Sequence, residues 1–127
     1  MIEARRKNKK TRLYIDKEFI SSGYASEYRK FSLIDIYTSL AYYANYESQK
    51  CFPSIETIMH NTGLKNRNKV IKGIKKLEEL NIIFVIRSKG KKSNEYLLLD
   101  PSCWKKVNSI TGDTVQQYQK QIKVHFI

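Results

Sequence analysis

The segment from Asn66 to Asn81 constrains the fold most strongly, because its apolar residues repeat with the period of an α-helix. One side of this helix collects Val70, Ile74, Leu77 and Leu80, with Ile71 at its margin. The opposite side collects Lys65, Asn68, Lys69, Lys72, Lys75, Lys76 and Glu79. Between Lys65 and Lys76 there are six basic residues and no acidic one. The sequence therefore predicts a helix with one buried face and one face rich in positive charge.

Asn66 is a suitable N-cap, so we expect this helix to begin there. Gly73 lies in its interior, where glycine costs roughly 1 kcal/mol relative to alanine. Two explanations remain open: another backbone approaches the helix at this point, or the glycine is merely tolerated.

A shorter helix is predicted immediately before the basic one. Ser54 follows Pro53 and is a good N-cap for a helix over residues 54–61. Ile55, Ile58 and Met59 have helical spacing, so one side of this helix can be buried. Gly63 tolerates the left-handed conformation that ends helices, and Leu64 supplies an apolar residue in the turn. Two helices joined by a tight turn are therefore expected over residues 54–81.

A β-hairpin is predicted directly after the basic helix. Residues 82–88 are mostly β-branched or aromatic, and residues 95–99 are their expected antiparallel partner. The loop of residues 89–94 is polar and rich in lysine, and residues 50–53 are a candidate third strand. The order helix, turn, basic helix and basic hairpin predicts a winged helix-turn-helix. We expect an α+β fold, mainly α, with a wing sheet of two or three strands and a C-terminal helical tail.

Before this unit, residues 33–44 carry another helical apolar pattern and are predicted to form a scaffold helix. Its expected core positions are Leu33, Ile36, Tyr37, Leu40, Tyr43 and Ala44. Ser32 and Asp35 resemble a capping box at its start. Residues 21–30 are polar and are predicted to be a loop broken at Gly23.

The two ends of the chain are predicted to extend beyond a central domain of residues 13–100. Residues 1–12 are strongly basic with little to bury, and we expect them to be a disordered arm. In the tail, residues 101–127, Asp100 and Pro101 favour a short helix to Val107. Residues 114–126 carry an apolar stripe, which either packs on the same domain or forms a homodimer contact. We expect the dimer.

The net charge of +12 is unevenly placed. Residues 1–12, 65–76 and 87–92 hold six, six and four of the 24 Lys and Arg residues, with Glu3 as their only acid. Such clustering is typical of a protein that binds a polyanion. No apolar run is long enough to span a membrane, and the basic N-terminus lacks the apolar core of a secretory signal, so we expect a cytoplasmic protein.

Catalysis is not indicated. Cys51 and Cys103 form no CxxC motif, and the two histidines, His60 and His125, are far apart in sequence. No glycine-rich phosphate loop and no nucleophile with a basic partner is visible. We therefore expect neither an enzyme nor a cofactor, metal or small-molecule ligand.

Double-stranded DNA is the partner that the charge pattern favours, although basic surfaces often serve solubility alone. The first turn of the basic helix carries amide and basic side chains that can contact base edges, and the hairpin tip is placed to contact phosphates. Bases and phosphates are expected to be contacted by Lys65, Asn66, Arg67, Asn68, Lys69, Lys72, Lys75, Lys76, Lys89, Lys91, Lys92, Arg5 and Arg6.

Residues 14–100 resemble a winged helix-turn-helix family of phage and plasmid replication proteins and small regulators of mobile elements. The resemblance rests on Phe31–Leu33, Leu40–Asn45, Cys51–Ile58, Thr62–Lys65, Val70–Ile83 and Ser93–Leu98. It implies that the helix beginning near Asn66 enters the major groove. The family reaches its first buried helical valine one residue sooner after the turn than Val70 does here.

Four functions remain open on the sequence. The first is a sequence-specific DNA-binding regulator of transcription in a mobile element, virus or plasmid. The second is an initiator or accessory protein that binds origin repeats. The third is a winged helix used for protein assembly, and the fourth is RNA binding. DNA binding predicts a steep salt dependence and discrimination between duplexes, whereas assembly through apolar patches predicts neither.

Overall fold

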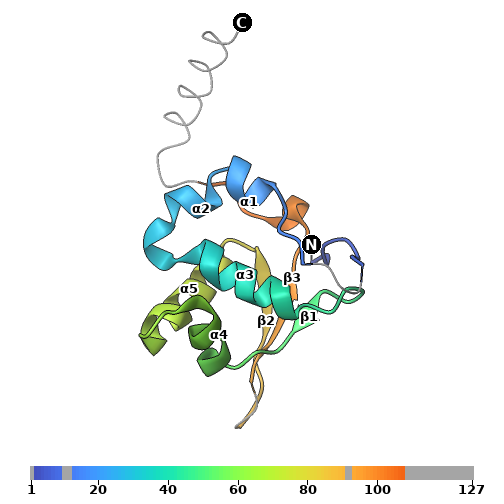
Figure 1. Ribbon diagram of the computed structural model, residues 1–127. Coiled ribbons are helices and arrows are strands. Elements are labelled where there is room, and N and C mark those ends of the chain that lie inside the picture. The colour runs from blue at the N-terminus through green and yellow to red at the C-terminus, as the bar shows by residue number, and fades with distance from the viewer. Residues whose placement is uncertain (1, 10–12, 91–92, 108–127) are drawn as a thin grey trace, which may run out of the picture.

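A computed structural model describes residues 2–9, 13–90 and 93–107 of the chain (Figure 1). Three longer helices surround the core: α3 (Leu33–Tyr43), α4 (Ile55–Thr62) and α5 (Arg67–Glu79). The shorter elements are α1 (Glu18–Ser21), α2 (Tyr24–Glu27), η1 (Arg29–Phe31), β1 (Lys50–Cys51), β2 (Ile83–Ile86), β3 (Glu95–Leu98) and η2 (Pro101–Cys103). The predicted order of helix, turn, helix and hairpin is confirmed.

The three strands form one antiparallel sheet in the order β1-β3-β2. Val85 pairs with Tyr96, and both side chains point into the core. Phe84 and Ile86 alternate with them and are more than one third exposed, as expected for a sheet with one covered face. The candidate strand at residues 50–53 is confirmed over Lys50–Cys51.

The turn between α4 and α5 has the predicted caps. The Ser54 hydroxyl accepts a hydrogen bond from the Thr57 backbone N–H at 3.1 Å. Gly63 ends α4 with a φ of 75°, a left-handed conformation that favours glycine. Leu64 packs partly buried against the core. The local signals at residues 54–64 thus fix both ends of α4.

The core joins α3 to elements that precede and follow it. The rings of Phe19 and Tyr37 stack with centroids 4.8 Å apart, and Trp104 meets both edge-on. The indole Nε1 of Trp104 donates to the Leu99 carbonyl at 3.0 Å. The helix expected from Pro101 to Val107 is shorter than predicted, because only the single turn η2 forms before Trp104 turns into the core.

The region before α3 differs from prediction. Residues 21–30 hold the helix α2 and part of η1 instead of a loop, and Tyr24 of α2 is buried beside Trp104. Ser32 makes no capping hydrogen bond, because its backbone is left-handed with a φ of 54° instead of extended. The capping-box prediction was therefore wrong. Tyr43 is 40% exposed and lies outside the core, whereas Leu33, Ile36, Tyr37 and Leu40 are buried as predicted.

The N-terminal segment is not a free arm in its described part, residues 2–9. Ala4 forms an antiparallel bridge with Leu99, and the Arg5 backbone N–H donates to the Leu98 carbonyl at 3.0 Å. The Asn8 N–H donates to the Tyr46 carbonyl at 2.7 Å. The prediction of disorder was wrong for these residues, because their backbone forms hydrogen bonds beside the C-terminal end of β3, at Leu98 and Leu99.

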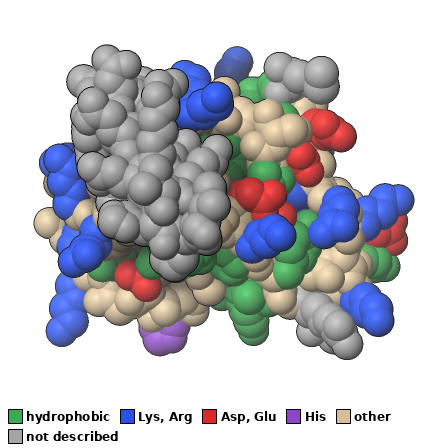
Figure 2. Space-filling view, turned by 90° about the horizontal axis from the view of Figure 1, so that it is seen from above, with side chains coloured by type: hydrophobic (Ala, Val, Ile, Leu, Met, Phe, Trp, Pro, Cys, Tyr) green, Lys and Arg blue, Asp and Glu red, His purple; other side chains and the backbone are tan. Residues whose placement is uncertain are grey.

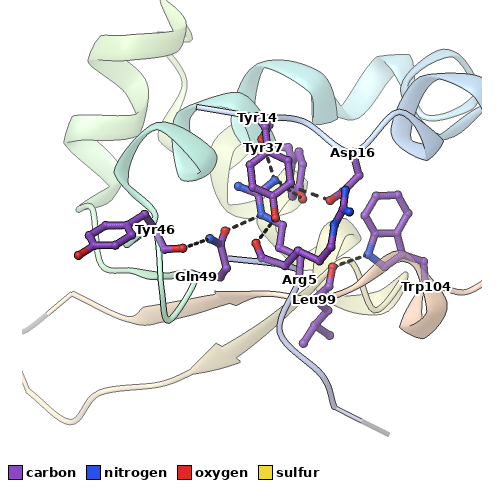
Figure 3. A network of polar contacts seen from close by, with 9 residues as sticks. Arg5, Tyr14, Asp16, Tyr37, Tyr46, Gln49, Leu99 and Trp104 are labelled. Atoms are coloured by element: carbon purple, nitrogen blue, oxygen red, sulfur yellow. Dashed lines mark hydrogen bonds and ion pairs between the residues drawn. The ribbon is translucent and has the colours of Figure 1, made fainter. Parts of the chain in front are cut away.

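The side-chain contacts of Arg5 hold the N-terminal segment against the core (Figure 3). The prediction of Arg5 as a DNA contact was wrong. The Arg5 side chain is buried, with Nε donating to Gln49 Oε1 at 2.7 Å and Nη1 donating to the Tyr14 carbonyl at 2.7 Å. The guanidinium lies 3.7 Å from the Tyr14 ring centroid and 3.7 Å from Asp16 Oδ2. Burial raises the pKa of the Asp16 carboxyl even though Arg5 opposes the shift. Arg5 is therefore a core residue.

Two free thiols lie in different environments. Cys51 is buried, and burial raises the pKa of its thiol to about 12, whereas Cys103 is partly exposed. Because the thiolate is the reactive form, we expect one fast-reacting thiol in the native protein and two after denaturation. Titration with a chromogenic disulfide reagent measures this. A Cys103→Ser variant with a remaining fast thiol would contradict the buried position of Cys51.

The predicted tail helix and homodimer contact of residues 114–126 lie outside the described residues, and they stay predictions.

Candidate nucleic-acid interface

The candidate interface consists of the exposed side of α5 together with the wing, which we define as β2, β3 and the loop of residues 87–94. Val70, Ile74 and Leu77 face the core from α5. The exposed residues at its start and along its outer side are Lys65, Asn66, Arg67, Asn68, Lys69, Lys72, Lys75 and Glu79. The predicted division of this helix into a buried and a mainly basic face is confirmed.

Gly73 brings the first part of α3 and η1 close to α5. A Cβ at this position would lie 2.2 Å from Ile36 Cδ1 and 2.8 Å from the Phe31 carbonyl oxygen. Of the two explanations for this glycine, close approach is correct. The contact fixes the position of η1 along one flank of α5.

The first turn of α5 is held by Asn66. Its side-chain oxygen accepts hydrogen bonds from the backbone N–H groups of Asn68 at 2.9 Å and Lys69 at 3.4 Å. That oxygen is committed to capping, so Asn66 retains its amide N–H groups for a ligand. Asn68 lies exposed on the side of α5 opposite Val70 and Leu77. An asparagine amide in this position has the donor and acceptor pair that matches adenine in the major groove.

Four lysines of α5 and the turn before it form no ion pair within 4.0 Å in the described part of the chain. Among the described residues, ion pairs within 4.0 Å involve Arg5, Arg67, Lys76 and Arg87 as the cations. The lysines of this helix and its preceding turn without such a pair are Lys65, Lys69, Lys72 and Lys75. Exposed lysines of this kind attract solvent anions or a polyanion, and their contacts with phosphates make binding depend on salt.

Arg67 and Lys76 lie on opposite sides of α5, to either side of the exposed surface formed by Asn68, Lys72 and Lys75. Arg67 pairs with Glu56 of α4. Lys76 is mostly covered, with its side chain 25% exposed, and its Nζ lies 2.9 Å from Glu79 Oε2. Residues 67 and 76 are nine positions apart, which is two and a half helical turns, so their side chains point in opposite directions from α5. Both residues were predicted as contacts, and the structure places them at the border of the surface.

The wing is anchored to α5 by a two-pronged ion pair. Arg87 donates from Nη1 and Nη2 to the two carboxylate oxygens of Glu78, each at 2.8 Å. These hydrogen bonds lower the pKa of the Glu78 carboxyl. Lys89 is exposed beyond this anchor, and the predicted contacts Lys91 and Lys92 lie outside the described residues. Arg87 thus orients the wing, and Lys89 is available to a ligand.

A groove of about 500 Å³ separates the wing from the helices. Its walls include Ser54 and Glu56 at the start of α4, Arg67 at the start of α5, and Ser93 and Asn94 from the wing. The groove brings the start of both helices and the wing loop to one side of the molecule. The N-terminal segment, including the exposed Arg6, lies on the other side of the molecule from α5 (Figure 1). The structure therefore does not bring Arg6 together with the other predicted contacts.

Two basic residues of the same surface were missed by the sequence analysis. Arg29 and Lys30 belong to η1, which packs against α5, and both are exposed. Their position depends on the close contact at Gly73 and on the short helix α2, which the sequence analysis assigned to a loop. The only local signal was the pair of adjacent basic residues before the scaffold helix.

Neither a metal site nor a membrane-spanning helix is found in the described ranges. Residues 2–9, 13–90 and 93–107 contain no group of three or more His, Cys, Asp or Glu side chains placed to hold a metal ion. Within the same ranges, no helix has both the length and the apolar character needed to cross a membrane.

Comparison with known proteins agrees with this geometry. Residues 35–83 match the family model described as a helix-turn-helix domain. The match runs from the first turn of α3 through α4 and α5 to the start of β2. Comparisons with curated proteins and with solved structures gave no match. The chain thus has the fold of a winged helix-turn-helix, with residues 35–83 similar to a helix-turn-helix domain.

Proposed function

We propose that this protein binds double-stranded DNA in a sequence-specific manner, with the N-terminal half of α5 in the major groove. The observation that carries the proposal is the outer side of α5, where lysines without an ion pair among the described residues surround the exposed amide of Asn68. Phosphate contacts supply affinity and base-edge contacts supply specificity, and this surface has side chains suited to both.

The position of the wing supports the same proposal. An α-helix fits the major groove, and the sugar-phosphate backbone borders that groove on each side. The groove between Arg67 and the wing offers space for one backbone, with Gly90, Ser93 and Asn94 of the wing on its far side. Glu56 is the acid beside Arg67, so binding a phosphate there requires Arg67 to exchange one anionic partner for another.

Asn68→Ala and Lys72→Ala are each expected to weaken binding to the preferred duplex by about 1–3 kcal/mol, because each removes a base-edge contact. Their effect on a random-sequence duplex should be much smaller. Fluorescence anisotropy at fixed salt measures both affinities. Lys17→Ala serves as the control, because Lys17 is exposed at the start of α1, away from α5. Equal losses on preferred and random DNA would show that this side of α5 does not read bases.

We further propose that the protein acts as a transcriptional regulator of a mobile element, virus or plasmid. Selection from random duplexes with the full chain at near-physiological salt gives the preferred site, which is then located in the DNA that encodes the protein. A site overlapping a promoter supports the regulator. An array of repeated sites beside an origin would instead assign the chain to replication initiation.

A further inference from the structure

We propose that η1 forms a second phosphate-binding site, made by Arg29 and Lys30 together with Lys76, on the flank of α5 opposite the wing. The inference rests on the proposed DNA binding and deepens it. It assigns contacts to both DNA backbones that border the groove occupied by α5, one through the wing and one through η1.

The geometry of the cluster begins with Phe31. The Lys30 Nζ lies 5.3 Å from the Phe31 ring centroid, and the Lys76 Nζ lies 5.0 Å from the same centroid. The Lys76 Nζ is also 5.5 Å from the Tyr28 ring centroid. Aromatic faces attract ammonium groups, so the two rings hold cations from two separate elements in one place.

The charge of the cluster is poorly balanced by the protein. The two ammonium groups share one ring and so lie within about 10 Å of each other, which is about one Debye length at 0.1 M salt. Glu79 pairs with Lys76, but Arg29 and Lys30 have no ion pair within 4.0 Å among the described residues. A phosphate would relieve the repulsion that remains.

The cluster is rigidly placed relative to the reading surface. The absent Cβ of Gly73 allows the Phe31 carbonyl to approach α5, and the Ser32 N–H donates to the Arg29 carbonyl at 3.0 Å. Seen from above, Lys and Arg side chains lie at both lateral edges of the molecule (Figure 2), and the exposed basic residues of η1 and α5 include Arg29, Lys30, Lys69, Lys72 and Lys75. Arg67, the Arg87–Glu78 pair and the wing lie on the other flank of α5.

The test compares two double variants of the full chain that each lose two positive charges. Arg29→Ala/Lys30→Ala removes the proposed contacts, and Lys17→Ala/Lys50→Ala is the matched control. Lys50 lies in β1, across the molecule from α5 (Figure 1). All four residues are exposed, so neither variant is expected to disturb the core.

Affinity for a random-sequence duplex and for the selected duplex is measured over a series of salt concentrations. The η1 variant is expected to reduce the slope of log K against log salt by about 2 on both duplexes, because each phosphate contact contributes about 0.9. The control variant should keep nearly the full slope. An η1 variant with the slope of the unaltered chain would overturn the inference.

Phosphate ethylation interference then locates the contact. In the η1 variant, ethylation of some phosphates should no longer weaken binding. These phosphates should lie across the major groove from the phosphates whose ethylation no longer weakens binding of a Lys89→Ala variant. Loss of the same phosphates in both variants would contradict the two-flank arrangement. Failure of the proposed function would give a different result, because the unaltered chain would then not distinguish the selected duplex from random DNA.

Discussion

Arg5→Ala is expected to lower the free energy of unfolding by about 3–5 kcal/mol, the usual cost of removing one partner from a buried ion pair. The substitution leaves Gln49 Oε1 and the Tyr14 carbonyl without their hydrogen-bond donor and the Asp16 carboxyl without its cation. Total stabilities of about 5–15 kcal/mol make this a large fraction of the whole. Urea denaturation followed by tryptophan fluorescence measures the change, since Trp104 lies in the same core.

Arg6→Ala is the matched control for Arg5→Ala. Arg6 is the neighbouring residue, carries the same charge and is exposed, so its replacement should change stability by no more than about 0.5 kcal/mol. Arg5→Lys keeps the charge but loses the planar pair of donors, and should recover only part of the stability. If Arg5→Ala were as stable as Arg6→Ala, the guanidinium would not be the anchor of the N-terminal segment.

Gly73→Ala is expected to destabilise the protein, although alanine is the better helix former by roughly 1 kcal/mol. The new Cβ would lie 2.8 Å from the Phe31 carbonyl oxygen and 2.2 Å from the buried Ile36 side chain. Overpacking of this kind costs about 1–3 kcal/mol or more, and at this site the obstructing backbone atom cannot rotate away. After the gain in helix propensity, we expect a net loss of up to about 2 kcal/mol and a melting temperature lower by up to roughly 10 °C.

Lys75→Ala provides the comparison for Gly73→Ala within the same helix. Lys75 is exposed on the outer side of α5, so its replacement should leave the melting temperature almost unchanged. Differential scanning calorimetry of the three chains gives both values. A Gly73→Ala chain that melts at or above the temperature of the unaltered chain would contradict the close packing of η1 and α3 on α5.

The contrast between Arg5 and Arg6 marks the limit of what the sequence could predict. Both residues lie in the same basic run, and composition alone predicts the same exposed state for each. Their difference arises from tertiary contacts with Gln49, Tyr14 and Asp16, which are distant in sequence or belong to segments without a strong pattern. By contrast, the helices α4 and α5 were predictable, because local caps at Ser54, Asn66 and Gly63 agree with the apolar period.

The part of the candidate interface that lies on α5 could be predicted from the sequence, but the contribution of other elements could not. The period of α5 places Asn68, Lys69 and Lys72 on its exposed side, and the structure agrees. Sequence alone could not separate Arg67, which pairs with Glu56, from the lysines that form no ion pair within 4.0 Å in the described part of the chain. Nor could it bring Arg29 and Lys30 to the same surface, since that requires the turn at Ser32 and the contact at Gly73.

The most direct test of sequence-specific binding is the ratio of two dissociation constants at one near-physiological salt concentration. One constant is for the duplex selected by the full chain, and the other is for a random-sequence duplex of the same length. A protein that reads bases through α5 should prefer the selected duplex by at least about 10³-fold. A ratio near one would contradict sequence-specific DNA binding, even if both duplexes bound tightly.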